Sequence, residues 1–158
     1  MERKVICHYI SIILGVTLSL LVGCNIHQGQ IKQPVADNKP TYKDFVSTHT
    51  FPYVAPLEKQ TYLKHNYSRL SVGFTKHEVN KILGEPDYSQ PIYSKITPPG
   101  YLGSSWTYFF EKPNPNLTSL KEDKSIQILF DAIDKTHWIT SNVEGLNEIG
   151  NPRTQDSQ

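Results

Sequence analysis

Apolar residues recur along this chain with two different periods, and the change from one period to the other predicts helices followed by strands. Leu63, Tyr67 and Leu70 are spaced i, i+4 and i+7. This spacing is typical of the buried stripe of a helix. We therefore expect a short helix from about Lys59 to Arg69.

A second helix is marked by signals at both of its ends. Thr75 can cap the first turn while Glu78, three residues later, returns a hydrogen bond to the cap residue. Gly84 lies directly after the last helical residue, where a positive φ is common and glycine is favoured, and Pro86 prevents the helix from continuing. These signals predict a helix from Lys76 to Leu83. Its inner face would consist of Val79, Ile82 and Leu83.

The period changes to two in the second half of the chain. Trp106, Tyr108 and Phe110 alternate with Ser105, Thr107 and Phe109, which gives an aromatic-rich face and predicts a strand from about Ser104 to Glu111. The same pattern returns at Ile126, Ile128 and Phe130, and a turn at Asp131 to Lys135 leads into a third strand from Thr136 to Ser141. The predicted fold class is α+β, with two short helices packed on one face of a three-stranded antiparallel sheet.

The first residues have the organisation of a secretion signal. Arg3 and Lys4 precede an uncharged apolar stretch from Ile10 to Val22. This stretch has 13 residues. A transmembrane helix needs about 20, so a permanent membrane span is the weaker alternative. We expect residues 1–23 to be a signal peptide.

The signal ends in a motif that resembles the bacterial lipobox, Leu21-Val22-Gly23-Cys24. In such motifs the cysteine is lipidated, freed by cleavage and acylated on its new amino group, which implies a covalent lipid on Cys24 and no other cofactor. Cys7 would leave with the signal, so the mature chain would hold no free thiol; a Cys7–Cys24 disulfide is the alternative. Several acyl chains on one cysteine give firm membrane attachment.

Composition divides the remaining chain into three parts. Residues 24–56 contain the lipidated cysteine and a stretch rich in Gln, Asn, Thr and Pro, which we expect to be an extended tether. Residues 57–143 would form the folded domain, and residues 144–158 a polar, disordered tail.

Net charge and motif spacing exclude several function classes. The 158 residues carry a formal net charge of +1, too little to expect nucleic-acid binding driven by bulk charge. His77-Glu78 begins like a helical zinc motif, but Lys81 replaces the second histidine. His27, His49, His65 and His137 lack metal-ligand spacing. We therefore expect no metal and no enzyme.

Aromatic residues supply the candidate binding positions. Trp106, Tyr108 and Phe110 are expected to form one side of the core, because a three-stranded sheet needs an apolar face against its helices. Tyr53, Tyr93 and Tyr101 stand in Pro-rich segments of the sequence, where an amphipathic ring is better placed to fill a pocket on a partner. We predict these three tyrosines as partner anchors.

Taken in order, these motifs resemble those of the SmpA/OmlA (BamE-like) family of outer-membrane lipoproteins. The resemblance rests on the lipobox, Val72-Gly73-Phe74-Thr75-Lys76-His77-Glu78-Val79, Leu83-Gly84-Glu85-Pro86 and Trp106-Thr107-Tyr108-Phe109-Phe110. It implies a two-layer sandwich fold and a lipid-anchored protein on the periplasmic side of the outer membrane. It also implies an accessory role in assembling β-barrel proteins, with the assembly machinery and anionic lipid as partners.

Two departures from the family pattern bear on the partner and on the hairpin. The segment from Pro86 to Trp106 is longer than the family pattern and reads as an inserted loop. The turn from Asp131 to Lys135 lacks the usual glycine, so Asp134 or Lys135 is expected to adopt a left-handed conformation. The alternative function is an envelope lipoprotein of the same fold with another role, in stress response or in binding a secreted protein.

Overall fold

The computed structural model describes residues 38–96, 99–116 and 122–150. The chain divides into a unit of residues 1–30 and a unit of residues 31–158, and all described residues belong to the second. The predicted signal peptide and Cys24 lie outside the described residues, so both stay predictions.

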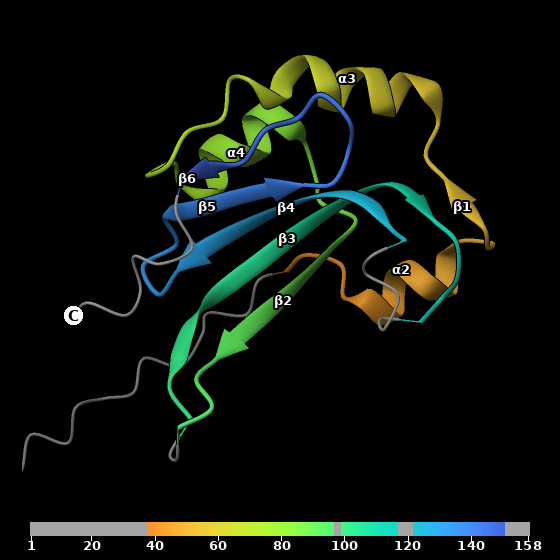
Figure 1. Cartoon of the computed structure of the whole chain (residues 1–158). Coiled ribbons are helices and arrows are strands. Elements are labelled where there is room, and N and C mark those ends of the chain that lie inside the picture. The colour runs from red at the N-terminus through yellow and green to blue at the C-terminus, as the bar shows by residue number, and fades with distance from the viewer. Residues whose placement is uncertain (1–37, 97–98, 117–121, 151–158) are drawn as a thin grey trace, which may run out of the picture. The chain divides into compact units, whose positions relative to one another are not determined.

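The described residues form three helices and a six-stranded open sheet, an α+β architecture (Figure 1). The helices are α2 (Tyr42–Thr48), α3 (Leu57–Tyr67) and α4 (Lys76–Leu83). The strands are β1 (Tyr53–Val54), β2 (Tyr88–Tyr93), β3 (Tyr101–Lys112), β4 (Lys124–Asp131), β5 (Thr136–Ser141) and β6 (Ile149–Gly150).

The expectation of a three-stranded sheet is wrong, because three further strands pair with the predicted ones. The order is β1-β3-β4-β5-β6, and β2 also pairs with β3; every pairing is antiparallel. β3 is long enough to hold β2 along its first half and β1 at its last two residues. The predicted inserted loop between Pro86 and Trp106 is therefore mostly a β-hairpin.

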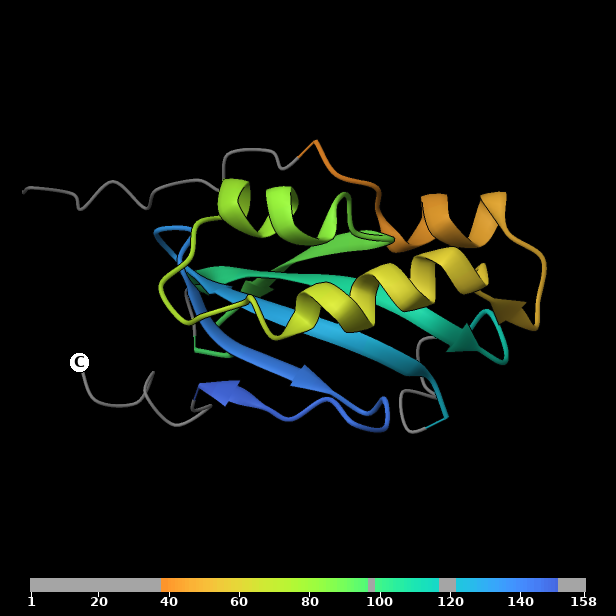
Figure 2. The ribbon, with the colours of Figure 1, turned by 90° about the horizontal axis from the view of Figure 1, so that it is seen from above.

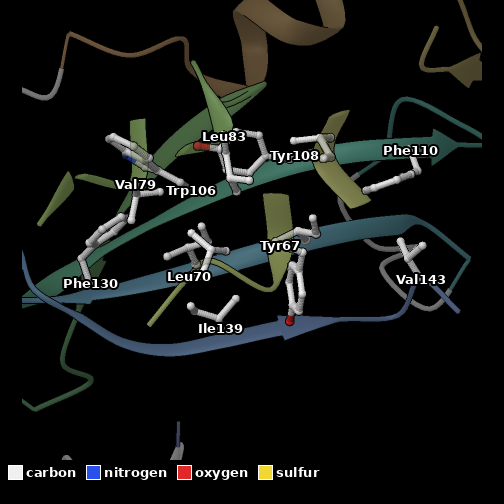
Figure 3. Close-up of a cluster of buried hydrophobic side chains, with 13 residues drawn as sticks. Tyr67, Leu70, Val79, Leu83, Trp106, Tyr108, Phe110, Phe130, Ile139 and Val143 are labelled. Carbon is white, nitrogen blue, oxygen red and sulfur yellow. The ribbon is translucent and has the colours of Figure 1, made fainter. Parts of the chain in front are cut away.

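The main core lies between the sheet and the two predicted helices. α3 and α4 lie across one face of the sheet (Figure 2). Trp106, Tyr108 and Phe110 point into this core, as predicted (Figure 3). The helix α3 contributes Leu63 and Tyr67. Burying such large apolar side chains is the dominant favourable contribution to folding.

The predicted ends of α4 are confirmed in detail. The Thr75 hydroxyl accepts a hydrogen bond from the Glu78 N–H at 3.2 Å, and the Glu78 carboxylate accepts one from the Thr75 N–H at 2.7 Å. Gly84 ends the helix at φ +75°. The β4–β5 turn also contains the predicted left-handed residue, which is Asp134 at φ +62°.

A second, smaller core lies on the opposite face of the sheet, beneath α2. Phe109 points away from the main core and packs against Phe45 of α2, with ring centroids 4.9 Å apart. Tyr53, Ala55 and Tyr88 complete this cluster. The prediction of an extended tether is therefore wrong for residues 42–54, where a helix and a strand belong to the folded domain.

The end of the described chain is also folded rather than a free tail. β6 pairs with β5, and Leu146 and Ile149 pack against the main core. The Tyr67 hydroxyl donates to the Asn147 carbonyl at 2.7 Å. The prediction of a disordered tail is therefore wrong for residues 144–150, and residues 151–158 lie outside the described part.

Candidate functional site

Histidine and acidic side chains do not assemble into a reactive cluster within residues 38–96, 99–116 and 122–150. No group of three or more His, Cys, Asp or Glu residues there could hold a metal ion. His77 is exposed on α4, whereas His49 stacks on Phe45 with ring centroids 4.4 Å apart. The acidic residues of the β4–β5 turn act as turn formers: Asp131 accepts from the Ile133 and Lys135 N–H groups.

Exposed and half-buried apolar side chains lie instead at the end of the β2–β3 hairpin. We call the four residues Tyr93, Ile96, Tyr101 and Leu102 the tip patch. The Tyr93 and Tyr101 rings meet edge to face, with centroids 5.9 Å apart. Ile96 is 76% exposed, and Tyr93 and Leu102 are also exposed. Single exposed apolar residues are common, but several of them grouped at one place are informative.

The hairpin carries the tip patch beyond the rest of the sheet. β4 pairs with β3 only from Gly103 onward, where Gly103 stands opposite Asp131. Beyond that point the hairpin is held by hydrogen bonds between its own two arms. The Ser94 N–H, for example, donates to the Gly100 carbonyl at 2.8 Å. Figure 1 shows this hairpin projecting past the ends of β4 and β5.

A glycine is required where the hairpin leaves the sheet. Gly103 has φ +145°, which side-chain-bearing residues rarely adopt, and a Cβ there would lie 1.9 Å from the Phe130 carbonyl oxygen. The end of β4 can approach β3 this closely because residue 103 has no side chain.

A second exposed apolar surface surrounds the start of α3. We call Val54, Leu57 and Tyr62 the α3 patch. Leu57 is 77% exposed, and Val54 and Tyr62 are also exposed. A shallow groove of about 540 Å³ runs beside Leu57 and Tyr62. The Tyr62 hydroxyl donates to the Ile82 carbonyl at 2.9 Å, which holds its ring against α4.

The two patches lie at opposite ends of β3. Tyr101 begins this strand, and Glu111, near its end, pairs with Val54 of the α3 patch. Ten residue steps along the strand separate these positions, which corresponds to roughly 33 Å at 3.3 Å per step. The domain can therefore make two separate contacts at once.

The structure brings two of the three predicted anchor tyrosines together and removes the third from the surface. Tyr53 lies in β1 and is buried in the second core, not in a free loop. Burial raises the pKa of its hydroxyl, which stays protonated at neutral pH. Beside it, Lys59 and Asp87 form an ion pair at 2.5 Å, and Asp87 also accepts from the Phe109 N–H at 2.7 Å. This polar group joins α3 to the sheet.

Sequence reasoning missed the aliphatic part of both patches. Ile96, Leu102 and Leu57 carry no motif, and only their exposure in the fold distinguishes them from core residues. The segment Pro98-Pro99-Gly100, a typical turn signal, lies between two runs with β-forming residues and was the available sign of a hairpin.

Comparisons with known proteins give no family, relative or structural neighbour. No family model matches the chain, and no curated protein or solved structure matches it. Within the described residues, no helix is long and apolar enough to cross a membrane.

Proposed function

We propose that this chain is a noncatalytic lipoprotein, held by a lipid on Cys24 at the periplasmic side of the outer membrane. It would act there as an accessory interaction subunit in the assembly of β-barrel outer-membrane proteins. The signal, the lipobox and the resemblance of its motif order to the SmpA/OmlA family support this proposal.

The observation that carries the interaction role is the pair of exposed apolar patches at opposite ends of β3. Exposed apolar groups that are rimmed by polar residues are typical of contact surfaces. In the α3 patch, Leu57 stands beside a groove with Tyr62 on its wall. Tyrosine is enriched among the residues that dominate protein–protein contacts, and the Tyr62 ring is fixed by its hydroxyl, so we assign the α3 patch to the protein partner.

The projecting β2–β3 hairpin favours a second candidate role. The segment between Pro86 and Trp106 is longer than in the family pattern, and it forms most of this hairpin. A surface that the family pattern lacks can bind a partner that the family does not bind. The alternative is an envelope lipoprotein that acts in stress response or binds a secreted protein.

Affinity isolation tests the proposal and separates the two roles. The full-length chain with a C-terminal tag is recovered from detergent-solubilised outer membrane, washed with salt, and analysed by mass spectrometry. With the wild-type chain, we expect barrel-assembly subunits to copurify in amounts comparable to that of the tagged protein. Recovery of another envelope protein in their place would overturn the assembly role and support the alternative.

A matched pair of variants ties the result to the α3 patch. Leu57→Asp should lower recovery of the partner about tenfold or more, because it places a carboxylate in an apolar contact beside the groove, and about 1.4 kcal/mol corresponds to tenfold in affinity. Ile133→Asp is the control, because Ile133 is 70% exposed and belongs to neither patch. Equal recovery with both variants would contradict the assignment of the α3 patch.

A further inference from the structure

We propose that the tip patch inserts among the lipid headgroups of the membrane that holds Cys24. The hairpin would be a second membrane contact besides the lipid anchor, and it would orient the domain. This inference rests on the proposed lipid attachment. It assigns lipid headgroups as the contact of the tip patch, whose exposure the attachment alone does not explain.

The chemistry of the tip matches the boundary between headgroups and acyl chains. Tyr93 and Tyr101 have an apolar ring and a polar hydroxyl, and tyrosine is enriched at membrane interfaces for this reason. Ile96 and Leu102 offer aliphatic side chains to the same boundary. Transfer of such apolar side chains from water to the lipid interface is favourable in free energy.

The charge at the tip is compatible with an anionic lipid surface. Lys95 is the only charged residue in the sequence from Tyr88 to Phe110, so this stretch brings no carboxylate to an anionic surface. At the same end of the sheet, the β4–β5 turn has two aspartates, Asp131 and Asp134, and they are balanced by Lys135 and by Lys76, which pairs with Asp134 at 2.9 Å.

The point where the chain joins the domain places the tip within reach of the membrane. Lys39 forms an ion pair with Glu85 and lies over the Trp106 ring. The Pro40 carbonyl accepts from the Ser89 N–H of β2 at 2.8 Å. Ser89 is four residues from the end of β2, so the tip begins roughly 13 Å from the docked chain.

The length of chain before this docking point limits how far the domain can stand from the bilayer. Fifteen residue steps separate Cys24 from Lys39. Fully extended, they span at most about 50 Å. Within this limit the projecting hairpin can reach the surface, and its contact there would leave the α3 patch, at the other end of β3, available to a partner.

The inference is tested by measuring the depth of the tip in a bilayer. The full-length mature lipoprotein is reconstituted into vesicles of phosphatidylethanolamine and phosphatidylglycerol. Ile96→Cys carries an environment-sensitive fluorophore, and nitroxide-bearing lipids serve as quenchers. Loss of Cys7 with the signal and lipidation of Cys24 would leave the engineered thiol as the only one.

Leu57→Cys is the matched control, because its exposure of 77% equals that of Ile96 within one percent. We expect the label at residue 96 to shift to the blue and to be quenched at least twofold more than the label at residue 57. Equal quenching at the two positions, in protein that has bound the vesicles, would overturn the inference. The tip would then be a protein contact or an unused surface.

Vesicle binding tests the lipid anchor separately from the membrane contact of the tip patch. Failure of the labelled protein to bind vesicles at all would count against lipidation of Cys24, and thus against the proposed function. A Lys95→Glu variant refines the positive result. It should reduce quenching at residue 96 in vesicles that contain phosphatidylglycerol, because it replaces the one cation at the tip by an anion.

Discussion

Lys112 and Asp123 form an ion pair that is sealed from solvent where β3 and β4 diverge. The Nζ–Oδ2 distance is 2.8 Å, and the side chains are 0% and 1% exposed. The Lys112 ammonium also donates to the Asn116 carbonyl at 3.1 Å and lies 5.3 Å from the centre of the Phe109 ring. The pair thus joins the second core to the β3–β4 connection.

Breaking this pair should be costly because it leaves one charge buried without its partner. Lys112→Met is expected to lower the free energy of unfolding by about 3–5 kcal/mol, and Lys112→Met/Asp123→Leu by less than that. Urea unfolding measures both. The exposed pair of Lys124 and Glu111, also at 2.8 Å, is the control, and Lys124→Met should cost under about 1 kcal/mol. Equal costs for Lys112→Met and Lys124→Met would contradict the burial of Lys112.

The departure of the hairpin from the sheet depends on residue 103. Gly103→Ala should destabilise the domain by about 3 kcal/mol or more, because the positive φ and the contact with the Phe130 carbonyl oxygen add their costs. Gly145→Ala is the matched control: φ is +84° there, but no atom lies within 4 Å of the added Cβ. Thermal unfolding measures both variants. A Gly145→Ala variant that is less stable than Gly103→Ala would argue against the close approach of residue 103 to the Phe130 carbonyl oxygen.

Folding of the segment before Tyr53 can be tested at α2. Phe45→Ala is expected to cost about 3–5 kcal/mol, because it leaves a cavity against Phe109 in the second core. Val54→Ala, at an exposed position, should change the free energy of unfolding by no more than about 0.5 kcal/mol. If the two substitutions were equally harmless, α2 would not be part of the folded domain.

The acid side of the stability profile should depend on His137. Burial lowers the pKa of this imidazole, and Asp131 opposes the shift only in part. The unfolded chain then binds the proton at a higher pH than the folded one, so stability is full above about pH 6.5 and falls as pH drops through the lowered pKa. His137→Gln should flatten this fall between pH 7.5 and 5, whereas His77→Gln, at an exposed helix position, should not. A fall of the same size in both variants would exclude His137 as its source.

Much of the main core could be predicted because its sequence signals are local and mutually consistent. The capping box of Thr75 and Glu78, Gly84, and the alternation through Trp106, Tyr108 and Phe110 all act within one element. The helical period and the strand period were both long enough to be recognised.

The missed elements are short or carry conflicting signals. α2 has seven residues and one buried side chain, Phe45, although Thr41 and Asp44 form a capping box that marks its start. Pro91 lies within β2, where it argues against a strand unless the strand lies at an edge. β1 and β6 have two residues each and exist only through their partners.

The candidate site was less predictable than the fold because exposure is a property of the whole arrangement. Tyr93 and Tyr101 were predicted as surface residues from their Pro-rich context, and the same reasoning failed for Tyr53, which pairs with Lys112 at the sheet edge. Nothing local distinguishes Leu57 from a core leucine. Likewise, no local signal pairs Lys112 with Asp123.

Attachment through Cys24, on which the proposed function depends, can be measured by metabolic labelling with a radioactive fatty acid. We expect label in the wild-type protein and in Cys7→Ser, and its complete loss in Cys24→Ser. Cys7→Ser is the matched control, because these are the two cysteines of the chain. Label that persists in Cys24→Ser, or that is absent from the wild-type protein, would contradict the account.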